Sequence, residues 1–170
     1  MKNLIMMIGL PASGKSTFRN YICDKYDSTV VISSDDCIEK EGNKKSLTYN
    51  QVFHDKDVQS YCKRYTEEIF INAIENNKDI LIDRTNLTIK SRRKIISRLP
   101  SDYKIHYVWF NLPRCFINHN MFERYMNTEK IISKNIVDDM ENWFQEPLEH
   151  EYHTLTIIDE NNNNYDFEME

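Results

Sequence analysis

The chain has 170 residues, of which 40% are hydrophobic and 29% are charged, a balance that is typical of one globular domain. No stretch approaches the roughly 18 consecutive apolar residues of a membrane span, so the sequence predicts a protein without one. The four cysteines are scattered and form no C-x-x-C pair. We therefore expect neither a zinc site nor a disulfide framework, and reduced thiols in the cytoplasm.

The net charge of −5 conceals an uneven distribution along the chain. From Asn135 onward there is no Lys or Arg, so all 22 basic residues precede that position. Residues 1–134 are therefore mildly basic, which suits a nucleotide substrate but not tight binding along an extended duplex. Residues 159–170 form an acidic, Asn-rich tail, which we expect to be mobile or loosely attached.

Strand and helix patterns alternate through residues 1–158. Apolar and β-branched runs predict strands at 4–8, 29–32, 79–83, 103–111 and 154–158. Helical spacing predicts helices at 16–26, 52–77 (one long helix or two joined ones), 88–99, 114–125 and 133–144. The polar segment 39–46 predicts a loop. This order predicts a single α/β domain with three layers, in which helices cover both faces of a mostly parallel sheet.

A phosphate-binding motif follows the first predicted strand. Residues 9–16 read Gly-Leu-Pro-Ala-Ser-Gly-Lys-Ser and match G-x-x-x-x-G-K-[ST], with a helix after them. The glycines let backbone N–H groups surround phosphates, and the helix N-terminus adds partial positive charge. Lys15 reaches the β- and γ-phosphates, and the Ser16 hydroxyl ligates Mg²⁺. The predicted cofactors are ATP and Mg²⁺, with the nucleotide held by Gly9, Pro11, Ala12, Ser13, Gly14, Lys15, Ser16 and Thr17.

Two carboxylates follow the second predicted strand. Asp35 and Asp36 lie at the sheet edge where ligands bind in α/β folds, which suits a general base that accepts a substrate hydroxyl proton. Both are candidate substrate contacts. The run Ser33-Ser34-Asp35-Asp36 suits a helix cap equally well, so one Asp could cap while the other catalyses.

The third predicted strand ends in a further candidate group. Asp83 follows an apolar run, as in a Walker-B element that helps to hold Mg²⁺. Arg84, the nearest cation to the predicted site in a basic stretch that extends to Arg98, is a candidate contact for a substrate phosphate. Thr85 and Asn86 could hydrogen-bond the substrate or only form a turn. Most of the other basic residues in this stretch suit a solvated helix face.

Phosphoryl transfer also requires cations over the developing charge and a cover against water. The helix after the fourth strand suits such a lid, at about residues 114–134. It contains Arg114, Arg124, Lys130 and Lys134. The residues by themselves do not choose among these four cations.

Several of these segments together resemble the kinase domain of phage polynucleotide 5′-hydroxyl kinases. The resemblance covers about residues 1–150 and includes residues 9–17, 33–36 and 83–87, Arg92-Arg93, and the trio Met140, Phe144 and Pro147. It implies that Lys15 and Ser16 bind nucleotide and metal, and that Asp35 activates the attacking hydroxyl. It also implies that Asp83 supports the metal or acceptor side, and that Arg124 is the lid arginine that stabilises the transferring phosphate.

Three positions depart from that pattern. Ile38 stands where the family has an Arg that grips the acceptor's phosphate, Ser34 replaces a frequent Arg, and Asn120 replaces the first of two lid arginines. We expect a kinase that acts on the 5′-hydroxyl end of a nucleic acid, as in DNA or RNA repair, without a phosphatase domain. The alternatives are a kinase for a nucleoside, modified base or other small molecule, and a non-catalytic nucleotide-binding switch.

Overall fold

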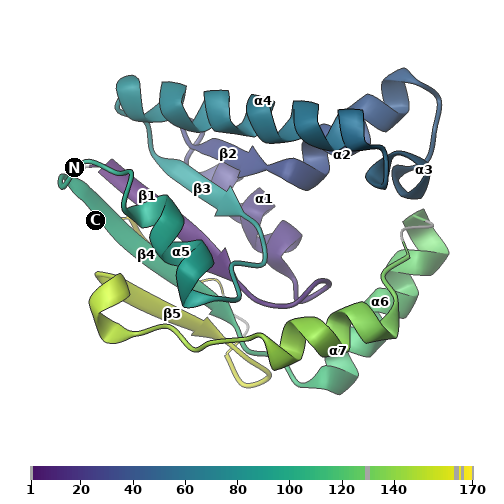
Figure 1. The fold of residues 1–170 in the computed structure, drawn as a ribbon. Helices are drawn as coiled ribbons and strands as arrows, with labels where there is room; N and C mark the ends of the chain where they lie inside the picture. The colour runs from purple at the N-terminus through teal and green to yellow at the C-terminus, as the bar shows by residue number, and fades with distance from the viewer. Residues whose placement is uncertain (1, 129–130, 163–164, 166, 170) are drawn as a thin grey trace.

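Five parallel strands form the central sheet of the protein, and Figure 1 shows helices on both of its faces. The computed structural model describes residues 2–128, 131–162, 165 and 167–169. The strands are β1 (Lys2–Ile8), β2 (Val30–Ser33), β3 (Ile80–Asp83), β4 (Tyr103–Phe110) and β5 (Thr154–Ile158). The helices are α1 (Lys15–Lys25), α2 (Ser34–Lys44), α3 (Tyr49–Phe53), α4 (Lys56–Glu75), α5 (Ile89–Ile96), α6 (Arg114–Thr128), α7 (Lys134–Asn142) and the 3-10 turn η1 (Glu149–Glu151).

The strand order β2-β3-β1-β4-β5 places the first strand at the centre of the sheet. From β1 the chain runs first to β2 and β3 on one side and then to β4 and β5 on the other. The switch point of the topology therefore lies at the carboxyl end of β1, where α/β proteins bind their ligands. Ser33 pairs with Asp83 in the β2–β3 ladder, so the carboxylates that follow these strands share one edge.

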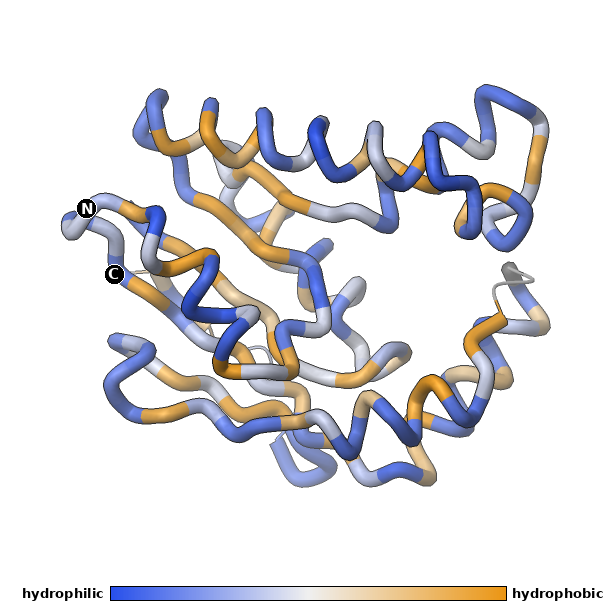
Figure 2. The backbone as a smooth tube through the Cα atoms, viewed as in Figure 1, coloured by the Kyte–Doolittle hydropathy of each residue, from blue (hydrophilic) through white to orange (hydrophobic). Residues whose placement is uncertain are grey.

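Alternating side chains of the central strand enter two different cores. Leu4 and Met6 pack with Phe70 of α4, whereas Ile5 packs with Phe18 of α1 on the opposite face. Strands that are buried on both faces have continuous apolar sequences, and Figure 2 shows hydrophobic residues concentrated in the sheet. The predicted three-layer α/β fold is confirmed.

The loop predicted at 39–46 is wrong, because α2 continues through most of that segment. The Ser33 hydroxyl caps this helix by accepting a hydrogen bond from the Asp36 backbone at 3.2 Å. Gly42 lies inside the helix, where a Cβ would come within 3.0 Å of the Leu47 carbonyl oxygen. The Gly therefore permits a close approach of backbone, rather than ending the helix.

The region predicted as one long helix or two joined ones contains α3 and α4. Packing of α2 on α4 brings Cys37 and Cys62 together in a disulfide with a Cα–Cα distance of 5.6 Å. The expectation of reduced thiols is therefore wrong for this pair, which tertiary packing alone makes adjacent. Cys23 and Cys115 are free. Among the described helices, none has both the length and the hydrophobicity that crossing a bilayer requires.

The C-terminal residues that the structure describes are attached to the domain, so the expectation of a loose tail is wrong for them. Phe167 is 3% exposed, and its ring packs edge-to-face on Phe18 with centroids 5.7 Å apart. Lys25 Nζ donates to the Phe167 carbonyl at 2.9 Å, and the Met169 N–H donates to the Tyr26 hydroxyl at 3.1 Å. Acidic residues alternate with these apolar ones, so the composition of the segment did not indicate that one side of it packs on the domain.

Candidate active site

The P-loop connects β1 to α1 in a backbone conformation that its sequence permits. A Cβ at Gly9 would lie 2.9 Å from Phe110 Cβ, so only Gly allows the loop to pass this close to β4. Gly14 adopts φ 93° and Ala12 φ 60°, both left-handed. Among the described residues no side chain caps the first turn of α1, which suits the binding of phosphate by its N–H groups. Ser16 is exposed at this turn.

Lys15 is buried inside the same loop. Its ammonium donates to the Gly9 carbonyl at 3.0 Å, to the Leu10 carbonyl, and to the Ser13 hydroxyl at 3.2 Å. Burial lowers the pKa of Lys15 to about 8, because removal from water disfavours the charged form. The loop thus holds a cation that is poorly solvated, and an entering polyphosphate would supply the missing negative charge.

Three charged groups from other elements lie close enough to act on the pKa of Lys15. Asp83 at the end of β3 and Asp35 in α2 raise it, and Arg124 in α6 lowers it, although burial is the larger cause. The structure therefore brings together around the P-loop four side chains that sequence reasoning placed in the site. They come from four elements that meet at the carboxyl edge of the sheet.

The two adjacent carboxylates of α2 have different partners. Asp35 Oδ1 accepts a hydrogen bond from the Tyr49 hydroxyl at 2.8 Å. Asp36 instead accepts two from Arg19 Nη1, at 2.9 and 2.8 Å. An ion pair holds Asp36 against α1, whereas Asp35 bonds to a neutral donor. Neither Asp caps the helix, because Ser33 does, and this division favours Asp35 as the base.

Arg19 is a site residue that sequence reasoning missed. Its Nη1 also donates to Asp83 Oδ2 at 3.0 Å, so one guanidinium bridges the Asp36 carboxylate of α2 and the Asp83 carboxylate at the end of β3. The ion pairs with both carboxylates raise the pKa of Arg19 against the opposing effect of burial. Its spacing of four residues from Lys15 places it one helical turn along α1, which is the signal that could have identified it.

Asp83 and Ser16 are the residues that could hold Mg²⁺. Burial raises the pKa of Asp83, while the charges of Arg19 and Lys15 oppose that rise. Within the described part of the chain, no group of three His, Cys, Asp or Glu side chains could hold a metal ion. Mg²⁺ usually takes one or two protein oxygens and completes its shell with phosphates and water. A hydroxyl and a carboxylate beside the P-loop therefore fit an ion that arrives with ATP.

The segment between β3 and α5 braces the P-loop. The buried Asn86 has φ 47°, and its amide donates to the Met7 carbonyl at 2.7 Å. The Gly9 N–H donates to the Thr85 carbonyl at 3.0 Å. These bonds fasten the segment to β1 and to the start of the loop. The Asn86 side chain is used inside the protein, which leaves the substrate role expected of it without support.

Two arginines of the basic stretch contact the protein itself. Arg84 Nη2 lies 3.5 Å from the Thr66 hydroxyl, so this guanidinium lies against α4. Arg92 is fully buried and pairs with Glu151 at 2.9 Å, while it also donates to the Gln145 carbonyl at 2.9 Å. For Arg92 the solvated helix face expected of most of this stretch is wrong, since it holds the segment before β5 against α5.

The predicted lid, at about residues 114–134, contains α6 and ends where α7 begins, and the two helices lie side by side in Figure 1. Arg114 joins them, with Nη1 at 2.9 Å from Glu141 and Nη2 at 2.6 Å from Asp138. The Asn120 amide donates to the Ala12 carbonyl at 3.0 Å. Asn120, at the position of the missing lid arginine, therefore attaches α6 to the P-loop.

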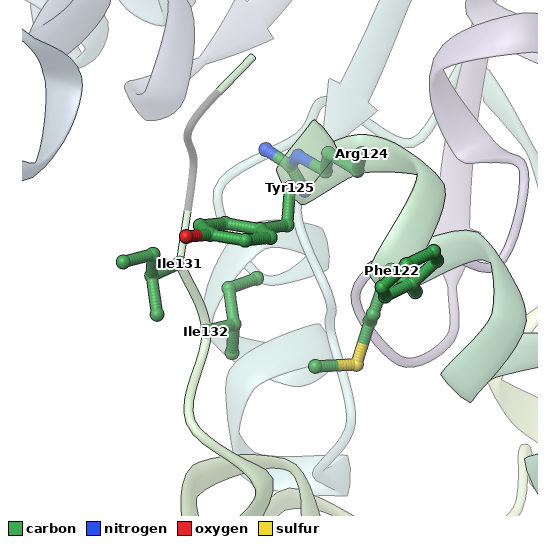
Figure 3. A pocket seen from close by; sticks show the side chains of 6 residues that line it. Phe122, Arg124, Tyr125, Ile131 and Ile132 are labelled. Carbon is green, nitrogen blue, oxygen red and sulfur yellow. The ribbon is translucent and has the colours of Figure 1, made fainter. Parts of the chain in front are cut away.

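Arg124 lines a cavity of about 300 Å³ on the lid, together with Tyr125 and Phe122 (Figure 3). The Ile131 N–H donates to Asn50 Oδ1 at 3.4 Å, so the lid reaches α3 on the opposite side of the site. Of the other lid cations, Arg114 joins the two helices, Lys134 begins α7, and Lys130 lies outside the described residues.

A P-loop at the switch point of a parallel sheet, with carboxylates and an arginine beside it, defines the P-loop nucleotide-binding fold. The chain belongs to the family described as "AAA domain", whose model matches residues 4–147.

Individual relatives support this assignment. Over 71 residues the chain is 35% identical to the 2',3'-cyclic-nucleotide 3'-phosphodiesterase of Pongo abelii, which covers 41% of this chain and 17% of that protein. A chain of the Pnkp1/Rnl/Hen1 RNA repair complex superposes with TM-score 0.68 and 23% identity, over 84% of this chain and 43% of its own length. A gluconokinase from Sinorhizobium meliloti superposes with TM-score 0.54 and 11% identity, over 92% and 82%.

The chain thus spans less than half the length of the first two relatives. At these identities the two solved structures show the fold alone. The family match and the shared fold of the RNA repair chain agree with the resemblance that the sequence motifs indicate.

Proposed function

We propose that this protein transfers the γ-phosphate of ATP to the 5′-hydroxyl end of a polynucleotide. The observation that carries the proposal is the convergence of Lys15, Asp35, Asp83 and Arg124 at one sheet edge. A cation in a phosphate-binding loop suits the donor, and a carboxylate opposite it suits the acceptor. Binding sites for both partners of a phosphoryl transfer thus meet at one point.

In the proposed reaction Asp35 accepts the proton of the acceptor hydroxyl. The hydroxyl oxygen forms a bond to the γ-phosphorus, the bond from that phosphorus to the β–γ bridging oxygen breaks, and ADP leaves with the bond electrons. Lys15 and Arg124 stabilise the negative charge on the transferring phosphate. Mg²⁺, held by Ser16 with the help of Asp83, would neutralise further charge on the phosphate oxygens.

A basic groove supports a polynucleotide as the acceptor. The groove has a volume of about 530 Å³ and is lined by Lys90, Arg93 and Lys94 of α5, together with Gln145. The Gln145 side chain accepts a hydrogen bond from the Ile89 N–H, at the end of the segment that follows Asp83. Clustered Lys and Arg suit the phosphates of a nucleic-acid strand. The RNA repair complex among the structural relatives agrees with this choice.

A small-molecule hydroxyl is the second candidate acceptor. Ile38 stands where the polynucleotide kinases have an Arg for the acceptor's phosphate, and it is 2% exposed inside the α2–α4 core. That position cannot grip a phosphate. The fold is also shared with a gluconokinase.

One labelling experiment separates the candidates. The protein is incubated with Mg²⁺ and ATP labelled at the γ-phosphate, together with 5′-hydroxyl DNA, 5′-hydroxyl RNA, nucleosides or gluconate in separate reactions. We expect label on the oligonucleotides, and label on nucleosides or gluconate alone would replace the first proposal with the second. Transfer to no acceptor, with ATP still bound, would favour a nucleotide-binding switch. The Lys15→Ala variant is the control and should transfer nothing.

A further inference from the structure

The hydroxyl of Tyr49 has a specific partner at the active site. It donates to Asp35 Oδ1 at 2.8 Å and so links α3 to α2. The structure shows that the polar end of this one ring bonds to the candidate base. We propose that Tyr49 is a positioning residue that fixes the Asp35 carboxylate for proton transfer, an inference that rests on the proposed function.

The surroundings of Tyr49 hold its ring in one place. Its ring packs against the cluster of buried residues that includes Val52 and Val58, and it lies 5.4 Å from the Phe53 ring. The helix that begins with Tyr49 has a reciprocal capping box between Thr48 and Gln51, which fixes its first turn. A phenol carried by this short capped helix therefore has little freedom to turn away from the carboxylate.

Tyr49 is also suited to donate a proton rather than accept one. Burial and the adjacent charge of Asp35 raise the pKa of Tyr49, so the phenol keeps its proton at neutral pH. A hydrogen bond to Oδ1 restricts rotation of the carboxylate about its last torsion. The other oxygen, Oδ2, is then oriented to receive the proton of an acceptor hydroxyl. A base that is fixed before the substrate arrives needs less reorganisation during the reaction.

The same short helix also contacts the lid. The N–H of Ile131, a residue beyond α6, donates to Asn50 Oδ1 at 3.4 Å. Asn50 is the residue directly after Tyr49. The charge of Arg124 also acts on the pKa of Tyr49, so the lid cation lies near this phenol. Helix α3 therefore contacts both the candidate base and the segment beyond α6, and the contact at Asn50 helps to keep Tyr49 in place.

The test compares Tyr49→Phe, Asp35→Asn and the double variant, using the acceptor that takes label in the experiment above. The Phe side chain keeps the ring packing and removes only the hydroxyl. We expect kcat of Tyr49→Phe to fall about tenfold, while KM for ATP and for the acceptor and the thermal midpoint stay unchanged. In the Asp35→Asn background, the same change should have no further effect on kcat, because Tyr49 acts through that carboxylate. Tyr61→Phe, on α4 and stacked on Tyr65, is the matched control and should leave kcat unchanged.

Each contrary outcome has a distinct meaning. A kcat of Tyr49→Phe within twofold of the parent would overturn the inference and leave the ring as packing only. A raised KM for the acceptor, or a second loss of kcat in the Asp35→Asn background, would show that Tyr49 contacts the substrate itself. An Asp35→Asn variant with the kcat of the parent would instead overturn the proposed role of Asp35, and with it the mechanism on which this inference rests.

Discussion

Among single residues, Lys15 couples nucleotide binding to pH. In the free protein the ammonium bonds to oxygens of its own loop and has a pKa of about 8. The negative charge of bound ATP favours the protonated form, so nucleotide raises that pKa. The complex then binds more protons than the free protein near pH 8. Affinity for ATP should therefore be insensitive to this group well below pH 8 and should fall as the pH rises past it.

This proton uptake can be measured by titration calorimetry at pH 8 in two buffers that differ in ionisation enthalpy. We expect an uptake of a fraction of a proton per ATP by the parent protein. The uptake should disappear in Lys15→Met, which keeps an apolar stem of similar length. Uptake that persists in this variant would mean that another group is the source.

A second prediction at this scale concerns the two carboxylates of α2. Asp35→Asn should lower kcat by at least about a hundredfold with little change in ATP affinity, since a general base contributes that much or more. Asp36→Asn should lower kcat by less than about tenfold, because Asp36 pairs with Arg19 and its side chain is 51% exposed. Steady-state kinetics of both variants measure kcat, and a binding titration measures their affinity for ATP. Equal losses in the two variants would contradict the division of roles.

At the scale of elements, the buried arginine of α5 fastens the segment before β5. Arg92 pairs with Glu151 and donates to the carbonyl oxygens of Asn86, Gln145 and Glu146. A buried guanidinium with these partners satisfies several acceptors that water cannot reach. One of these acceptors, Asn86, belongs to the segment that braces the P-loop. Loss of the Arg92 side chain should therefore also disturb the active site.

Arg92→Met should lower the free energy of unfolding by about 3–5 kcal/mol, because it leaves the Glu151 carboxylate buried without its partner. Urea unfolding of the purified variant measures this loss. Arg93→Met is the matched control on the next residue. Its side chain is 58% exposed and lies 4.0 Å from the same carboxylate, so its effect should stay below about 1 kcal/mol. Similar losses in the two variants would mean that burial of the pair matters little.

At the scale of the whole molecule, the C-terminal residues complete the core on the α1 face. Phe167 joins Phe18, Ile22 and Phe110 in one hydrophobic cluster. This cluster lies beneath the helix that presents the P-loop, so the end of the chain contributes to the support of the phosphate-binding helix.

Phe167→Ala should therefore lower the free energy of unfolding by about 3–5 kcal/mol, as expected for removing a buried aromatic ring. Glu168→Ala, at the exposed neighbouring position, should change it by less than about 0.5 kcal/mol. Urea unfolding with a common slope for both variants is the appropriate measurement. A negligible loss in Phe167→Ala would show that the segment is not part of the cooperative unit.

Local patterns in the sequence predicted the fold class, which the structure confirms, and the phosphate-binding loop. Apolar runs for the strands, helical spacing between them and the motif from Gly9 to Ser16 are local patterns, and local patterns can be read along a chain. The β3 terminus at Asp83 and the Asp35-Asp36 pair followed from strand ends in the same way. The helical character of residues 39–44 was missed, because polar residues and Gly42 suit a loop unless α4 is there to cover one side.

Which side chains meet depends on the tertiary structure. The bond from Tyr49 to Asp35, the bridge of Arg19 between two carboxylates, and the Cys37–Cys62 disulfide join residues from separate elements. The strand order and the packing of helices on the sheet bring these residues together, and the local spacing of residues predicts neither. The acidic composition of residues 159–170 predicted a loose tail. Phe167 is buried nevertheless, because Phe18, Ile22 and Phe110 provide the apolar surface on which it packs.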